Sequence, residues 1–173
     1  MGEATLGFLA EGRLTFTVVE VAARAGVGRR TVYRWWPTRD DLLVEALRTH
    51  VRTAPVVEAA GSWEADLRGL AHRLAEFAAG PVEVAIAALM VGDQHPEFSR
   101  MVLEHWRPAM ESWRRLVHAA AERGEVSDGI DPGTVIDTLL APIFYSPLTV
   151  RRPLPPSEVD ALVDLLLTGT RAR

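Results

Sequence analysis

Residues 17–43 read TVVEVAARAGVGRRTVYRWWPTRDDLL, and this stretch decides the fold. Thr17 and Glu20 have the spacing of a capping box, in which both side chains satisfy free amides at a helix start. The apolar positions that follow have the spacing of one buried helix face: Val18, Val21, Ala22 and Ala25. Gly26 suits the left-handed conformation that ends a helix. The stretch therefore opens with a short amphipathic helix and a tight turn.

A second helix is predicted from about residue 28 to Trp36, because Pro37 stops it. Its predicted inward positions are Val27, Val32 and Trp36, and its predicted outward positions are Arg29, Arg30, Thr31, Tyr33 and Arg34. Trp35 is left open between core and surface. Two helices joined by a glycine turn, the first with a small residue at the crossing, form a helix-turn-helix. The second helix of such a motif enters the major groove of DNA.

The side chains on this second helix suit DNA contact. Arg30 and Arg34 are four residues apart and share a helix face, and arginine is well shaped to contact guanine O6 and N7. Thr31 suits a thymine methyl or a phosphate, and Tyr33 suits a phosphate hydrogen bond. Two further contacts are expected outside the helix, from Thr17 and Arg39.

The charge distribution agrees with this interpretation, although the net charge is −4. All nineteen basic residues are arginine, and residues 24–39 hold five of them and no acid. They are Arg24, Arg29, Arg30, Arg34 and Arg39. Such a basic patch attracts phosphates. The ordinary alternative is a solvated helix face.

The whole chain is predicted to be all-α, because apolar residues recur with helical spacing and no run alternates with period two. A short helix is expected over residues 3–11, and later helices begin near Thr38, Ser62, Gly80, Pro96, Asp131 and Ser157. The segment 53–61 contains Pro55 and Gly61 and joins two domains. These are a helix-turn-helix DNA-binding domain, 1–50, and a helical ligand-binding and dimerisation domain, 51–173.

Three features of the second domain carry structural expectations. Residues 82–91 are apolar nearly all round, which predicts burial on all sides. Pro108 interrupts the helical tract 96–123 and predicts a kink or a break. No apolar stretch approaches the length of a membrane span and no signal peptide opens the chain, so we expect a cytoplasmic protein without a membrane role.

Large apolar side chains in the second domain are candidates for a ligand pocket, with an ordinary core as the alternative. The predicted ligand-binding residues are Phe77, Met90, Met101, His105, Trp106, Met110, Trp113, Phe144 and Tyr145. His95, Asp93, Glu97 and His105 also invite a metal interpretation. Their spacing fits no known ligand motif, so neither a metal nor a cofactor is expected.

A homodimer is expected, because one recognition helix reads too few base pairs and a two-fold protein matches a palindromic operator. Residues 131–146 and 157–168 are predicted to form the dimer interface. Its apolar positions are Val135, Leu139, Ile143, Val159, Leu162, Val163 and Leu166.

The first fifty residues resemble the DNA-binding signature of the TetR family of transcriptional regulators. The matching positions are Ala22, Ala25-Gly26-Val27, Thr31-Val32-Tyr33 and Trp36-Pro37. The resemblance implies DNA contacts from residues 29, 30, 31, 33 and 34, a relay of ligand binding through the fourth helix, and pairing of the last two helices across a two-fold axis.

Two departures from the family pattern stand out. Gly28 occupies a position where Ser or Thr often caps the recognition helix, which weakens that helix start by roughly 1 kcal/mol. The first helix is also shorter than is usual in the family, and no basic arm precedes it. Either the natural start lies upstream, or the protein binds DNA with a shorter brace.

The sequence thus predicts a ligand-responsive transcriptional regulator, a repressor that a small apolar effector releases from double-stranded operator DNA. An enzyme is not expected, because the chain has no cysteine, no G-x-S-x-G, no H-E-x-x-H and no phosphate-binding glycine loop. The alternatives are an all-helical small-molecule-binding protein or enzyme without a DNA-binding role, and a protein-interaction module.

Overall fold

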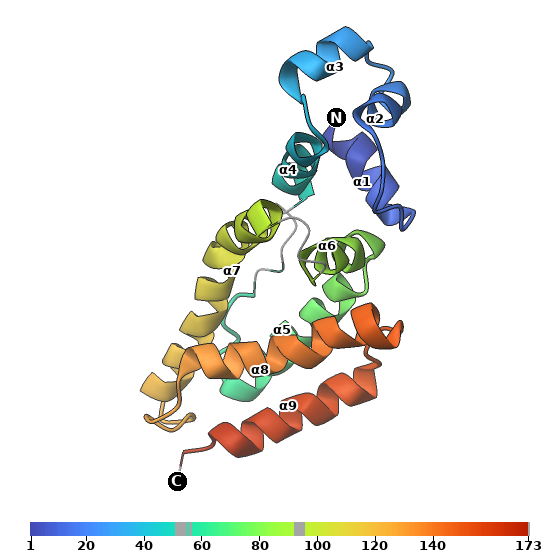
Figure 1. Ribbon diagram of the computed structural model, residues 1–173. Helices are drawn as coiled ribbons and strands as arrows, with labels where there is room; N and C mark the ends of the chain where they lie inside the picture. The colour runs from blue at the N-terminus through green and yellow to red at the C-terminus, as the bar shows by residue number, and fades with distance from the viewer. Residues whose placement is uncertain (51–54, 56, 92–95, 173) are drawn as a thin grey trace. The chain divides into compact units, whose positions relative to one another are not determined.

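The structure, a computed structural model, describes residues 1–50, 55, 57–91 and 96–172 (Figure 1). The described chain is a succession of helices without a β-strand, and one isolated bridge joins Val126 to Arg171. The predicted all-α class is therefore confirmed.

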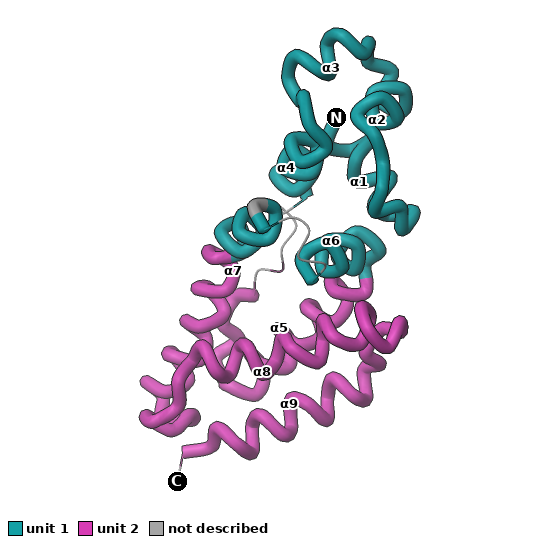
Figure 2. Tube along the Cα trace, in the orientation of Figure 1, with its two compact units in different colours: residues 1–53, 80–106 teal, residues 54–79, 107–173 magenta. Residues whose placement is uncertain are grey.

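The chain divides into two compact units (Figure 2). Unit 1 comprises residues 1–53 and 80–106, and unit 2 comprises residues 54–79 and 107–173. The units do not follow the predicted boundary at residue 50, because residues 80–106 bury apolar side chains in the core of unit 1. The division into domains 1–50 and 51–173 stays a prediction. The compact units differ from it in that residues 80–106 pack with the N-terminal helices.

Unit 1 begins with four helices: α1 (Gly2–Ala10), α2 (Val18–Arg24), α3 (Arg29–Trp35) and α4 (Arg39–His50). The predicted capping box at the start of α2 is present, since Thr17 and Glu20 each bond the other's backbone amide. A second box opens α4, where Thr38 and Asp41 bond in the same way. Gly26 has a φ of +66° and ends α2 as predicted. Local sequence thus sets these helix boundaries.

The core of unit 1 forms where α1 packs against α2, α4 and α6 (Pro81–Val91). Phe8 and Phe16 stack with their ring centroids 5.5 Å apart. The guanidinium of Arg24 lies 4.3 Å from the Phe8 centroid, and that of Arg39 lies 5.1 Å from the Phe16 centroid. Arginine thus covers an aromatic pair that would otherwise meet water.

The prediction that residues 82–91 are buried on all sides is wrong. In α6 the buried side chains are Glu83, Ala85, Ile86 and Leu89, whereas Val91 is exposed. The buried charge was not expected on so apolar a helix. The imidazole Nε2 of His50, the last residue of α4, contacts the Glu83 carboxylate and pairs it.

Unit 2 contains α5 (Trp63–Ala78), α8 (Pro132–Tyr145), the π-helix η2 (Ser146–Val150) and α9 (Pro156–Thr170). Its core includes side chains from α5, α8, α9 and the C-terminal part of α7 (Pro96–Glu122). Both buried tryptophans have bonded indoles, since Trp63 donates to Thr170 Oγ1 at 3.0 Å and Trp113 donates to the Pro55 carbonyl at 3.1 Å. These bonds remove the cost of burying an indole N–H.

A polar network ties α5 to α9 at the surface of unit 2. Arg68 reaches Asp160 at 2.8 Å and Asp164 at 2.9 Å, and His72 reaches Asp160 at 2.9 Å. His72, and then Arg68, hold the pKa of Asp160 below its usual range. The network accounts for the charged side of α9 that borders α5, where Asp160 and Asp164 pair with side chains of α5.

Helix α7 runs from Pro96 to Glu122 without a break, with Pro108 inside it, and the alternative prediction of a kink there stays a prediction. Helix α8 continues into η2, so residues 132–150 are long and apolar enough to cross a membrane, contrary to prediction. This segment instead supplies Ile136, Leu139 and Ile143 to the core of unit 2, where α8 packs against α5 and α9.

The capping box of α2 predicts a measurable acid response. Hydrogen bonds from Thr17 and Arg13 lower the pKa of Glu20 from 4.5 to about 2. Because the folded pKa is depressed, this stabilisation is present above about pH 4.5 and is lost as the pH falls through about 2. We expect Glu20→Gln to flatten that part of the curve of unfolding free energy against pH, as measured by denaturant titration.

The matched control is Glu122→Gln, because Glu122 is exposed and makes no ion pair within the described residues. If Glu20→Gln and the unmodified protein showed the same dependence of unfolding free energy on pH, the capping box would not be lowering the pKa of Glu20.

Candidate nucleic-acid interface

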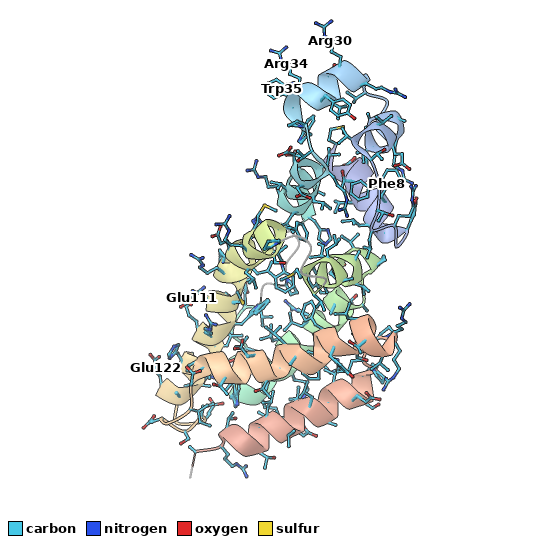
Figure 3. The ribbon with its side chains drawn as sticks, in the orientation of Figure 1. Phe8, Arg30, Arg34, Trp35, Glu111 and Glu122 are labelled. Carbon is cyan, nitrogen blue, oxygen red and sulfur yellow. The ribbon has the colours of Figure 1, made fainter. Side chains whose placement is uncertain are left out.

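Helix α3 presents nearly all of its surface to solvent. Val32 is its one buried residue, with 0% of its side chain exposed, while Arg29, Arg30, Thr31, Tyr33, Arg34 and Trp35 are exposed. At about 100° per residue, Arg30 and Arg34 lie on the side of the helix opposite Val32. Their side chains point away from the ribbon of unit 1 (Figure 3). This is the placement that the sequence predicts for a recognition helix.

Contacts at both ends hold α3 in place. The amide of Val27 donates to the Ala22 carbonyl at 3.0 Å across the Gly26 turn, and α2 packs against α3. At the other end Trp36 donates its amide to Val32 at 2.8 Å and is partly buried against the core. Gly28 caps the helix without a side-chain bond, as predicted. The helix is therefore fixed by its flanks and by Val32.

The predicted basic patch separates into two groups. Arg24 pairs with Glu11 and covers Phe8, and Arg39 donates to the Leu14 carbonyl. Both guanidinium groups are engaged within unit 1, which argues against the phosphate contact predicted for Arg39. The exposed cations on α3 are Arg29, Arg30 and Arg34, and no acid lies between residues 24 and 39.

The predicted DNA contact of Thr17 also meets a constraint. Its hydroxyl accepts from the Glu20 amide at 3.2 Å and donates to the Glu20 carboxylate at 2.8 Å. A phosphate that bonded this hydroxyl would compete with the carboxylate for the same proton. Within the part of the chain that the structure describes, no comparable side-chain hydrogen bond engages the exposed residues of α3. The predicted DNA-contacting surface, called the reading surface below, therefore remains Arg29, Arg30, Thr31, Tyr33 and Arg34.

The predicted ligand-binding residues do not meet around one described cavity. Within unit 1, Met90, Met101 and Trp106 pack partly buried against the core, and His105 is exposed. Within unit 2, Phe77 is partly buried, Met110 and Phe144 pack against the core, Trp113 is buried in it, and Tyr145 is exposed. Met101 lines a groove of about 560 Å³ in unit 1 with Val44, Phe98 and charged neighbours. The effector pocket stays a prediction.

The metal alternative gains no support within the described chain. Asp93 and His95 lie outside the described residues, as does the side chain of Glu97. Among the residues that the structure does describe, no three potential ligands gather closely enough to hold an ion.

The predicted dimer positions are largely occupied by packing within one chain. Six of them are buried in the core of unit 2, and Leu162 is partly buried against it; the six are Val135, Leu139, Ile143, Val159, Val163 and Leu166. The apolar stripe of α8 and α9 is satisfied within one chain, because these two helices pack on α5 and on each other. A dimer through these helices has to use their outer faces.

The sequence does not single out Leu165 as exposed, and it leaves Trp35 open between core and surface. Leu165 on α9 is 68% exposed beside a groove of about 320 Å³ that Ile130, Thr138 and Gly169 also line. Trp35 on α3 is 65% exposed. The available signal for Leu165 was its position beside the buried stripe of α9. Trp35 lies only about 60° around α3 from Val32, so periodicity gave no signal that it is exposed.

The arrangement of α2, α3 and the Gly26 turn, with an exposed cationic face free of acids, defines a helix-turn-helix DNA-binding protein. Comparison with known families identifies which one. Residues 8–46 match the model of the bacterial regulatory proteins of the tetR family, and residues 57–166 match the tetracyclin repressor-like C-terminal domain. The chain belongs to the TetR family of transcriptional regulators.

Individual relatives agree with this assignment. The HTH-type transcriptional regulator AqdR of Rhodococcus erythropolis is 28% identical over 151 residues, which cover 87% of this chain and 73% of AqdR. A TetR regulator from Agrobacterium tumefaciens has a TM-score of 0.80 at 23% identity, covering 99% of this chain and 92% of that one. FadR from Bacillus subtilis, solved in complex with stearoyl-CoA, has a TM-score of 0.70 at 14% identity, covering 98% and 97%. The relatives are regulators and not enzymes, which confirms the preferred functional class.

The exposed arginines predict a sequence-specific loss of DNA binding. Arg30→Ala should weaken operator binding by about 1–3 kcal/mol if the guanidinium contacts a guanine, and should relax discrimination at that base pair. Fluorescence anisotropy with operator and single-base variants measures both effects.

The matched control is Arg115→Ala, which removes the same charge from an exposed position in unit 2. Equal losses for the two variants would mean that only net charge matters and that α3 does not read bases.

Proposed function

We propose that this protein is a ligand-responsive repressor that binds a palindromic operator as a homodimer in the cytoplasm and is released by a small apolar effector. The observation that carries the proposal is the outer face of α3, where arginines surround Tyr33, itself 48% exposed, and where only Val32 is used for packing. The family membership supports the regulatory class.

Binding starts from the phosphates. Arg29, Arg30 and Arg34 attract the DNA backbone, and Tyr33 offers a hydroxyl to a phosphate. One helix of seven residues spans only a few base pairs, so a second copy is needed for specificity. A two-fold dimer places its recognition helices on half-sites about 34–36 Å apart.

The outer faces of α8 and α9 are the proposed dimer surface. Exposed small residues recur at helical spacing on them, namely Thr134, Thr138 and Ala141 on α8 and Ala161 and Gly169 on α9. Small side chains let two helices approach closely, and Leu165 and Tyr145 supply apolar area at the same faces. This assignment replaces the buried positions predicted from sequence.

The effector signal is proposed to reach the DNA-binding helices through α4. His50 at the end of α4 contacts the buried Glu83 carboxylate of α6, and α1 packs against both helices. A change in α6 would therefore act on α4 and α1 together. An effector lifts repression only as far as its affinities for the two conformations differ. The stearoyl-CoA complex of B. subtilis FadR supports a ligand with a long apolar chain for this fold.

The experiment that tests the function uses the purified full chain and DNA from upstream of its own gene. We expect saturable binding that is tighter than to scrambled DNA of equal length and that weakens steeply with salt. Stearoyl-CoA is the first effector probe, and its expected result is release of the DNA. Absence of any preference for the upstream fragment would overturn the operator proposal.

The proposed dimer surface yields its own prediction. Leu165→Glu places a charge on the outer face of α9, so the dimer should dissociate to monomers and operator affinity should fall at least tenfold, while the helical content stays unchanged. Light scattering after size exclusion measures the mass of the particle.

Leu103→Glu is the control, because Leu103 is equally apolar and 53% exposed but lies on α7 in unit 1. A Leu165→Glu protein with the mass of the unmodified dimer would remove α9 from the interface.

A further inference from the structure

Trp35 is the residue on α3 whose exposure the described fold does not explain. It is 65% exposed, whereas its neighbour Trp36 packs partly buried against the core of unit 1. Tryptophan has a large apolar surface and is highly buried on average, so an exposed ring on a contact surface points to a partner. Because it lies next to the exposed arginines of α3, the partner that it suggests is a polyanion.

The Trp35 ring is already associated with one of these arginines. The guanidinium carbon of Arg34 lies 5.6 Å from the ring centroid of Trp35, within the range of a cation–π contact (Figure 3). Arg34 makes no ion pair within the described part of the chain. The ring is therefore the neighbour that limits where this long side chain can point.

The helical geometry places Trp35 at the border between the exposed face of α3 and the side that carries Val32, about 60° around the helix from Val32. Arg30 and Arg34 lie at the centre of the exposed face, opposite Val32. Thr31 and Trp35 are four residues apart and form one flank, and Arg29 and Tyr33 form the other. When the centre of such a face enters the major groove, its flanks face the two sugar–phosphate backbones that border the groove.

We propose that Trp35 is a positioning residue for Arg34 and at the same time a contact to the DNA backbone. Its ring restricts the positions that the guanidinium takes before DNA is bound, and its indole Nε1–H donates to a phosphate oxygen of the bordering strand. This inference rests on the proposed operator binding and deepens it. It assigns Trp35 a share in specificity that neither the motif nor the relatives' names assign.

DNA is the occupant that the surroundings favour. Residues 24–39 contain no acid, so a polyanion meets only cations and apolar or hydroxyl groups on this face. An arginine that is held on an aromatic ring before binding loses less side-chain entropy when it contacts a base. The expected gain is therefore larger on the operator, where Arg34 meets its base pair, than on unrelated DNA.

A double-mutant cycle with Arg34 tests the positioning role. We expect Trp35→Ala to weaken operator binding about tenfold, and to relax discrimination at the same base pair that Arg34→Ala relaxes. The double variant should lose less than the product of the two single losses, because the contacts are coupled. Trp35→Phe keeps a ring but no indole N–H, and should restore discrimination while recovering only part of the affinity.

Two controls separate the possible outcomes. Thermal unfolding of Trp35→Ala should match that of the unmodified protein, since the side chain is exposed. Independent, multiplying effects of Arg34→Ala and Trp35→Ala would overturn the positioning role, and unchanged operator affinity in Trp35→Ala would overturn the inference entirely. Failure of the unmodified protein to bind its upstream DNA would instead contradict the proposed function.

Discussion

The recognition surface depends on the burial of one side chain, Val32. Helix α3 has seven residues, and Val32 is the only one that it gives to the core. Such a helix is too short to be stable alone, so its orientation comes from Val32, from the Gly26 turn before it and from Trp36 after it. Because only Val32 is buried, the other six positions of α3 are exposed and available to DNA. For the same reason, small changes in the core around Val32 would change the orientation of α3.

Arginines that are close in sequence have opposite roles in unit 1. Counting charge over residues 24–39 treats all five arginines alike, and the structure separates Arg24 and Arg39 from the rest because they cover Phe8 and Phe16. These two rings come from residues outside the counted stretch. The charge count points to a segment within the matched TetR-family region, residues 8–46, but overestimates the number of cations available to phosphate.

Local sequence signals were sufficient to predict where several helices begin and end. They could not predict contacts between residues far apart in the chain. The capping box at Thr17, the left-handed Gly26 and the cap at Ser62 depend on neighbours within four residues, and all three are present. The apolar stripes of α8 and α9 were also recognised, but a stripe does not say whether it packs within one chain or between two. The exposure of Leu165, the pairing of Glu83 with His50 and the place of α6 in unit 1 depend on residues far apart in the sequence.

The His50–Glu83 pair gives the regulatory proposal a physical basis. A carboxylate with 7% of its surface exposed on an apolar helix is costly unless it is paired, so separating α4 from α6 would leave a buried charge without its partner. The two helices are therefore expected to move as one body or to exchange this contact for another. Since α4 directly follows α3 in the chain, the proposed effector would displace α6 and so change the spacing of the two copies of α3 in the proposed dimer without touching α3. The seven-residue helix can then remain folded and exposed in both states, and only its distance from the copy in the partner subunit needs to change.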